Sequence, residues 1–268
     1  MGCVLTAVAV AVALSAHAPV VVHDSREKFP LASVAAAPAS VPGLDRDRRP
    51  TVYGRSVASR SGGTWLQYWF FYRGQDQDRG IVRTGRHAGD WEMVQYRVDG
   101  AGRPVEAVYA QHSGAERCDW AVVEQRDDHP VVYSARGSHA SYLRPGVRDR
   151  TFPDPNDEAD GRGTVVRPRV VRVTADSPRW MRWPGRWGAA RARWWIPGEQ
   201  DSPFGPAHQL QGRWTDPDAW AAAARTCRAE CDEVDECDWR ENLLGGGAGA
   251  GVAGILGLVW WRRRRRRR

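Results

Sequence analysis

The sequence predicts an all-β fold, an antiparallel β-sandwich with a C-terminal helix and a short C-terminal transmembrane or sorting tail. Short alternating or β-branched runs recur along the chain, and Gly, Pro, Asp and Asn separate them. No helical period lies between these runs, which argues against a parallel sheet with crossover helices. The predicted strands are residues 65–72, 91–98, 105–110, 121–124, 131–135 and 165–173.

The N-terminus has the pattern of an export signal over residues 1–18. An apolar run at residues 3–14 is followed by the small-residue motif Ala16-His17-Ala18. The first six residues also fit an N-myristoylation pattern, which is the rival interpretation. Residues 19–51 are rich in Ala and Pro without a sustained period, so we expect a linker there and a β-sandwich domain over residues 52–237.

One helix is predicted late in this domain. Asp216 can cap it, Pro217 fits its first turn, and the alanine-rich residues 220–228 favour helix, with residue 237 as its furthest end. Removal of the signal leaves four cysteines, whose spacing is not that of a zinc site. We therefore expect disulfides, with three pairings open, among Cys118, Cys227, Cys231 and Cys237.

The C-terminal tail, residues 243–268, joins an apolar stretch rich in Gly, Ala and Leu to seven arginines. As a helix the 19 apolar residues would extend about 28 Å, close to the hydrocarbon thickness of a bilayer. The arginines would stay on the cytoplasmic side, which places the domain outside. The layout resembles bacterial sorting tails that a membrane protease cuts. We therefore expect an exported protein that is anchored at the cell surface or released after tail cleavage; a disordered basic tail is the alternative.

The same arginines account for the formal charge of +7. Without them, basic and acidic residues balance at 32 each, so the domain lacks the basic excess that binds phosphate backbones. We therefore expect no nucleic-acid partner.

The stretch at residues 85–98 carries the candidate chemistry. Side chains two apart on a strand share a face, so Asp90 and Glu92 should lie on the buried face with Val94. Buried carboxylates need compensation by a cation, an arginine or hydrogen-bond donors. His87 precedes them and Asp76 lies nearby, and this set of one nitrogen and hard oxygens suits Mg²⁺ or Ca²⁺, with Mn²⁺ and Zn²⁺ as further candidates.

Several ordered motifs give the chain a family resemblance over residues 52–227. The chain resembles the vacuolar protein sorting-associated protein 62 family, which has no well-established activity. The motifs are Tyr53-Gly54-Arg55, Leu66-Gln67-Tyr68-Trp69-Phe70-Phe71-Tyr72, His87-Ala88-Gly89-Asp90-Trp91-Glu92, Gln111-His112-Ser113, His129-Pro130-Val131-Val132-Tyr133 and Ala135-Arg136-Gly137-Ser138-His139-Ala140-Ser141-Tyr142.

The central motif is also similar to the Gly-His-Arg-His-Asp-Trp-Glu signature of necrosis-inducing proteins. These are secreted β-sandwich cytolysins that hold a divalent cation and bind sphingolipid headgroups. The resemblance implies the metal ligands His87, Asp90 and Glu92, with Asp76 as the additional aspartate. This chain has Ala88-Gly89 where the signature has Arg-His, so lipid specificity does not transfer.

Two further features, a serine–histidine pair and a group of tryptophans, are candidates for a functional role. Ser138 and His139 are adjacent, so on a strand they point to opposite faces, and no nucleophile-elbow motif is present. We expect both to order a loop or to surround the metal ligands, and His112 to surround them or to have an ordinary polar role. Several tryptophans among arginines form either a cation–π surface for membrane or glycan contact, or ordinary core, and they are Trp180, Trp183, Trp187, Trp194 and Trp195.

These features favour a binding module over an enzyme. We expect an exported, membrane-tethered domain whose divalent cation binds a lipid headgroup or glycan. The alternatives are a metal-dependent hydrolase, with His139 or His112 as proton carrier, and a purely structural surface domain.

Overall fold

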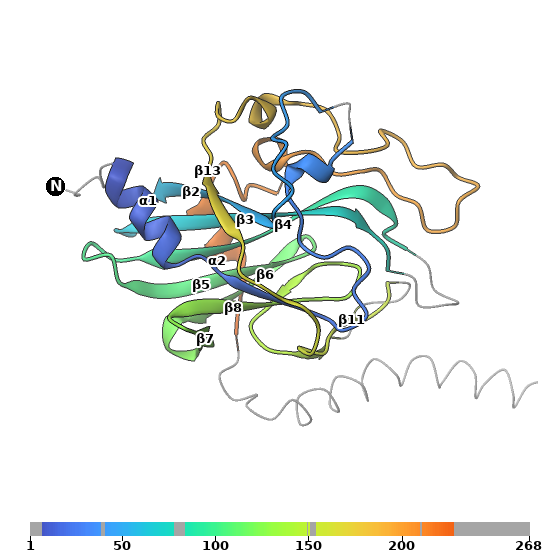
Figure 1. The fold of residues 1–268 in the computed structure, drawn as a ribbon. Coiled ribbons are helices and arrows are strands. Elements are labelled where there is room, and N and C mark those ends of the chain that lie inside the picture. The colour runs from blue at the N-terminus through green and yellow to red at the C-terminus, as the bar shows by residue number, and fades with distance from the viewer. Residues whose placement is uncertain are drawn as a thin grey trace, which may run out of the picture.

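The fold is a pair of open β-sheets with short helices and long loops around them (Figure 1). The computed structural model describes residues 7–38, 41–77, 84–148, 150, 154–209 and 211–227. The predicted tail and the cysteines Cys231 and Cys237 lie outside this part of the chain. Among the residues that the model describes, no helix combines the length and apolar character needed to cross a bilayer.

The larger sheet has seven strands in the order β13-β2-β3-β4-β5-β6-β14. Its centre is an antiparallel meander of β2 (Thr51–Ala58), β3 (Thr64–Gln75), β4 (His87–Val98), β5 (Pro104–Gln111) and β6 (Gly114–Asp119). Its edge strands β13 (Arg169–Arg172) and β14 (Arg225–Thr226) pair in parallel with β2 and β6. The expectation of a purely antiparallel fold is therefore wrong at the edges, where long connections return the chain in the same direction as its neighbour.

The smaller sheet is built from short strands, and β1 and β8 at its centre are also parallel. Its strands are β12 (Val165–Val166), β1 (Val20–His23), β8 (His129–Ser134), β7 (Gln125–Arg126) and, beside β8, β9 (Ser141–Tyr142). A separate ribbon pairs β10 (Gly146–Arg148) with β11 (Asp157–Ala159). The predicted strand at residues 121–124 is instead largely the 3-10 helix η2 (Trp120–Val122), and the predicted strand 165–173 divides at Pro168 into β12 and β13.

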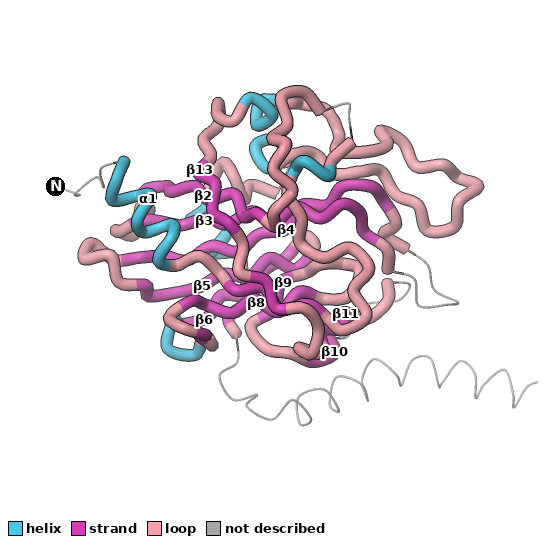
Figure 2. Tube along the Cα trace, viewed as in Figure 1, coloured by secondary structure: helices cyan, strands magenta, loops and turns pink. Residues whose placement is uncertain are grey.

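Each face of the larger sheet has its own hydrophobic cluster, as the alternation of side chains along its strands requires. On one face, Tyr68, Phe70 and Tyr96 meet Val21 and Val132 of the smaller sheet. On the other face, loops and short helices bring in further aromatic residues. Figure 2 shows these helices and loops gathered at the top of the view and the strands of the smaller sheet at the bottom.

Most of the tryptophans named from the sequence belong to that second cluster. Trp180 and Trp187 are 1% and 0% exposed, and they pack around Trp91 with ring centroids 5.7 and 5.0 Å away. They come from the 3-10 helix η3 (Arg179–Arg182) and the loop that follows it. For these two tryptophans the core interpretation is confirmed, whereas Trp194 and Trp195 are exposed.

The N-terminal segment packs on the domain. Helix α1 (Ala7–Ala16) buries Leu14 above Gly54, and β1 is buried between β12 and β8. Strand β1 lies in the predicted linker 19–51, so the folded domain begins N-terminal of Val52. The β-branched residues Val20, Val21 and Val22 form this strand, and the Ala/Pro-rich composition around them had indicated a linker. Removal of residues 1–18 as a signal stays a prediction, and it would leave β1 intact.

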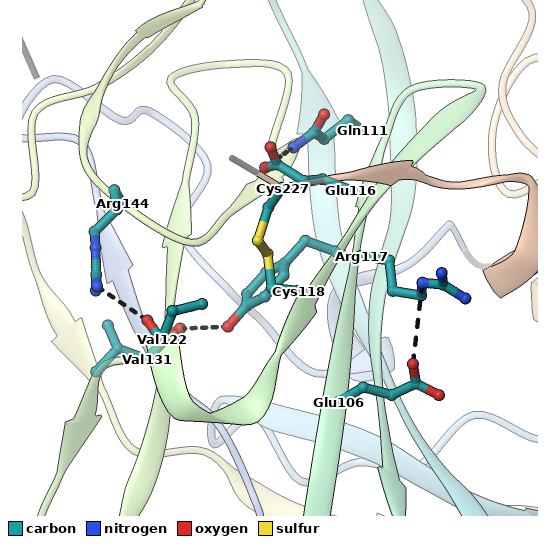
Figure 3. The surroundings of a disulfide bond; sticks show 10 residues. Glu106, Gln111, Glu116, Arg117, Cys118, Val122, Val131, Arg144 and Cys227 are labelled. Carbon is teal, nitrogen blue, oxygen red and sulfur yellow. Dashed lines mark hydrogen bonds and ion pairs between the residues drawn. A yellow bond between two sulfur atoms is a disulfide. The ribbon is translucent and has the colours of Figure 1, made fainter. Parts of the chain in front are cut away.

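The late helix begins as expected and ends early. Helix α2 (Pro217–Ala223) is capped by Asp216, whose carboxylate accepts from Ala219 N at 3.0 Å. It stops at Ala223, short of residues 228 and 237, because the next residues pair with β6 and Cys227 forms a disulfide with Cys118 (Figure 3). The 3-10 helices η1 (Val34–Ala36) and η4 (Pro206–His208) complete the fold. The disulfide confirms the expected cysteine chemistry and selects one pairing for Cys118.

Candidate functional site

The candidate site begins at the N-terminal half of β4. Asp90 and Glu92 are each 5% exposed, and they share a face with Val94 and Tyr96, as the two-residue period predicts. Asp90 lies opposite Tyr72 of β3, and Glu92 lies opposite Phe70. This face is directed toward the smaller sheet, so two carboxyl groups are enclosed between the two layers.

Asp90 is bound to a histidine from the turn after β8. Its Oδ2 lies 2.8 Å from Nδ1 of His139, and its Oδ1 accepts from Trp91 N at 2.9 Å. The other ring nitrogen of His139 lies 3.3 Å from Oε1 of Glu27, and the ring stacks on Tyr72 with centroids 3.9 Å apart. His139 thus bridges two carboxylates in a fully buried position.

This arrangement sets the protonation of the three groups. Burial alone would lower the pKa of His139, but its bonds to Asp90 and Glu27 raise it to about 9. Burial alone would raise the pKa of Glu27, but bonds to His139 and to two backbone N–H groups lower it to about 2. The pKa of Asp90 is also lowered, because the bond from His139 outweighs burial. The imidazolium therefore holds two ionised carboxylates at neutral pH.

Glu92 has a different environment. Its Oε2 is buried without a hydrogen-bond partner, and its nearest cationic atom is Nη1 of Arg213 at 3.8 Å. Burial raises the pKa of Glu92 well above the usual range, and the charges of Asp90 and Asp157 act in the same direction. Arg213, 2% exposed, donates to the backbone oxygen of His112.

A second polar cluster surrounds the side chain of Asp157 on β11. Its Oδ1 accepts from Ser138 at 2.5 Å, and its Oδ2 accepts from Tyr142 at 2.7 Å and lies 2.6 Å from Nε2 of His112. Burial alone would raise the pKa of Asp157, but these hydrogen bonds lower it. Ser138 and the adjacent His139 therefore serve different carboxylates and do not form a nucleophile–base pair.

The remaining predicted ligands lie at the edge of this site. Nδ1 of His87 lies 2.9 Å from the backbone oxygen of Gly89, and Oδ2 of Asp76 lies 3.5 Å from Nζ of Lys28. In the described ranges, no group of three or more His, Cys, Asp or Glu side chains is arranged to hold a metal ion. The four-residue ligand set stays a prediction, with Asp90 and Glu92 as its buried pair.

Three charged residues of the site escaped the sequence analysis. Glu27 lies in the predicted linker, Asp157 lies in a stretch without strand periodicity, and Arg213 stands among turn residues. All three meet β4 or the Ser138–His139 turn only through the tertiary fold. Local patterning therefore carried no signal for them.

Comparison with known proteins gives one family match. A model of the vacuolar protein sorting-associated protein 62 family matches residues 77–151, a shorter stretch than the expected 52–227. The match spans the β4 motif, His112 and the Ser138–His139 turn. No curated protein matches the chain.

Solved structures of necrosis-inducing proteins are similar to the chain at low identity. Necrosis and Ethylene inducing Protein 2, from the causal agent of cocoa's Witches Broom disease, is 15% identical with a TM-score of 0.39, covering 64% of this chain and 76% of its own. The non-toxic HaNLP3 protein is 16% identical with a TM-score of 0.45, covering 79% and 89%. NLPPya in complex with glucosamine is 15% identical with a TM-score of 0.38, covering 60% and 72%.

Proposed function

We propose that this chain is an exported, membrane-tethered binding domain in which Asp90 and Glu92 hold a divalent cation that contacts a lipid headgroup or glycan. The observation that carries the proposal is the Oε2 atom of Glu92, which is buried and has no hydrogen-bond partner. Buried carboxylate oxygens are normally satisfied, and Arg213 at 3.8 Å is beyond hydrogen-bond distance. A cation beside Glu92 would satisfy this oxygen.

The charge balance of the site supports the same conclusion. The side chains of Glu27, Asp90, Glu92 and Asp157 are all at most 7% exposed. Arg213 and the protonated His139 are the buried cationic groups that face them. The raised pKa of Glu92 shows that a proton relieves part of this excess of carboxylates, and a bound cation would take the place of that proton.

The donor set fits a hard divalent cation. Asp90 and Glu92 would supply carboxylate oxygens, which suit Mg²⁺ and Ca²⁺, and a nitrogen from His87 would also suit Mn²⁺ or Zn²⁺. Asp76 would complete the set by binding the ion in place of its present partner Lys28. When bound, such a cation would offer coordination to phosphate oxygens of a headgroup or hydroxyls of a sugar, which is why we propose these two ligand classes.

The second candidate is a purely structural role for the same carboxylates. His139 lies 2.8 Å from Asp90 and Arg213 lies 3.8 Å from Glu92, so each carboxylate already faces a cationic group. A hydrolase is less favoured, because His139 is fully buried and bound at both nitrogens. His112, with a side chain 24% exposed, is the remaining candidate proton carrier.

Elemental analysis of the purified full chain and its Asp90→Asn/Glu92→Gln variant tests the cation site. We expect stoichiometric divalent metal in the wild type only, and a stabilisation of about 2.7 kcal/mol when the ion is present at a hundred times its Kd. Glu106→Gln is the matched control, because Glu106 is a partly buried carboxylate that pairs with Arg97 at the other end of β4, and its loss should leave metal content unchanged. If the wild-type protein holds no metal and is not stabilised by Mg²⁺, Ca²⁺, Mn²⁺ or Zn²⁺, the cation site is wrong. The purely structural role of the carboxylates would then be the explanation.

Export and tethering are tested separately. We expect the full chain in the membrane fraction and a chain lacking residues 243–268 in the medium. If both forms remain inside the cell, the export proposal is wrong; if both reach the medium in equal amounts, the tether is wrong.

A further inference from the structure

The loop at residues 189–202 exposes two adjacent tryptophans at its tip. Trp194 is 89% exposed, the highest value among the large hydrophobic residues of the described chain, and Trp195 is 63% exposed. In Figure 1 the loop, drawn in orange, projects at the right of the view beyond the larger sheet. Aromatic residues contribute most of their stabilisation when buried, so two exposed tryptophans side by side indicate a contact surface.

The loop is held in a defined shape. At its base, Ser202 N donates to the backbone oxygen of Ala189 at 3.0 Å. Nearer the tip, Arg193 Nη2 lies 2.6 Å from Oε1 of Glu199, and Ile196 N donates to Arg193 O at 2.9 Å. These contacts present the two tryptophans on an ordered turn.

The loop is also joined to the larger sheet beside β4. Arg86, the residue before β4, donates its N–H to Gly198 O at 2.9 Å and accepts from Gln200 N at 2.8 Å. The tryptophan tip is therefore fixed relative to the sheet and does not depend on a cation at Asp90.

The chemistry of the tip fits a membrane interface. Tryptophan prefers the headgroup region, where its apolar ring and its N–H are both accommodated. Arg191 and Arg193 precede the pair and are exposed; Arg193 is paired with Glu199, so Arg191 is the arginine that would attract anionic lipid. The two rings are perpendicular, with centroids 5.9 Å apart, so they do not form the flat platform on which a sugar would stack.

We propose that this loop inserts Trp194 and Trp195 into the interface of an anionic lipid bilayer. This contact is separate from the predicted C-terminal tail and from the cation site. It would orient the domain on the membrane, with the start of β4 close to the lipid surface because Arg86 holds the loop.

Quenching of tryptophan fluorescence by brominated lipid tests the proposal. The starting protein is the full chain with Trp260→Phe and Trp261→Phe, which removes the tryptophans of the tail, mixed with vesicles of phosphatidylglycerol and dibrominated phosphatidylcholine in the presence of a chelator. We expect clear quenching, and loss of more than half of it when Trp194→Ala and Trp195→Ala are added. Both side chains are exposed, so urea unfolding should be unchanged.

Two controls make the result specific. Val147→Ala with Val165→Ala removes apolar surface that is 40% and 49% exposed elsewhere, and it should leave the quenching unchanged. Vesicles of dibrominated phosphatidylcholine alone should quench less, because Arg191 then has no anionic lipid. Quenching that persists without Trp194 and Trp195 would overturn the proposal. An absence of quenching would also overturn it, and self-association in sedimentation or binding of a soluble glycan that depends on the two tryptophans would then identify the contact that the loop makes.

Discussion

Acidification should destabilise this fold through one buried histidine before the carboxylates with lowered pKa values titrate. His23, at the end of β1, is 1% exposed, and its Nε2 accepts from Leu31 N at 3.2 Å while its Nδ1 has no partner. Burial, followed by the nearby charge of His139, lowers the pKa of His23 from 6.5 to about 4. The folded state therefore holds His23 neutral at pH values where the unfolded chain is protonated.

The sign and size follow from proton linkage. A lowered histidine pKa stabilises the folded state fully above pH 6.5, and this contribution is lost as the pH falls from 6.5 to about 4. The whole window corresponds to about 3 kcal/mol, of which about 2 kcal/mol is lost by pH 5. Glu27, with a pKa lowered to about 2, loses its contribution only below pH 4.5.

Urea unfolding followed by tryptophan fluorescence, at pH 6.5 and pH 5 with a chelator present, measures the effect. The matched variant is His23→Gln, whose amide oxygen can accept from Leu31 N without titrating. Other groups, including Glu92 with its raised pKa, titrate alike in both proteins, so the difference between them isolates His23. Between the two pH values we expect the wild type to lose about 1.6 kcal/mol more than the variant at constant m. Equal changes of stability in the two proteins would refute the lowered pKa of His23.

Three further predictions concern stability. Because the pKa of His139 is raised to about 9, its stabilisation is complete below pH 6.5 and should be lost as the pH rises to 9, by about 3 kcal/mol; this loss should disappear in His139→Gln, measured by urea unfolding. The double substitution Cys118→Ala with Cys227→Ala removes a disulfide between cysteines 109 residues apart, and it should lower the free energy of unfolding by about 4 kcal/mol. The measurement is the urea midpoint, and an unchanged midpoint would contradict this prediction. Gly89→Ala should cost more than about 2 kcal/mol, because φ is +61° and the new Cβ would lie 2.2 Å from Trp187 O, and a thermal scan that leaves Tm unchanged would show that the loop moves freely.

The sequence predicted the part of the site that depends on local period. Asp90 and Glu92 share the buried face of β4 because side chains alternate along any strand, whatever the fold. The partners that decide their charge, His139 and Arg213, come from 49 and 121 residues away in the chain. Distances of that kind are set by topology, which local patterning does not contain.

The fold shows the same division. The meander from β2 to β6 follows from alternating runs and short turns, so its antiparallel pairing was predictable. The parallel pairing of β1 with β8 and of β13 with β2 was not, because these strands are short and reach their neighbours by long connections. The end of α2 at Ala223 depends on the disulfide partner of Cys227, which the spacing of the cysteines left open.

The disulfide at β14 also determines how the domain would bear a mechanical load. All residues after Cys227 continue the chain from a point that is covalently joined to Cys118 in β6. A pull on the C-terminal tail would therefore pass through the sulfur atoms into the seven-stranded sheet, and the short pairing of β14 and helix α2 would carry little of the load. A tethered domain of this kind would resist extension until the sheet itself shears, whereas its reduced form would yield first by peeling β14 from the edge.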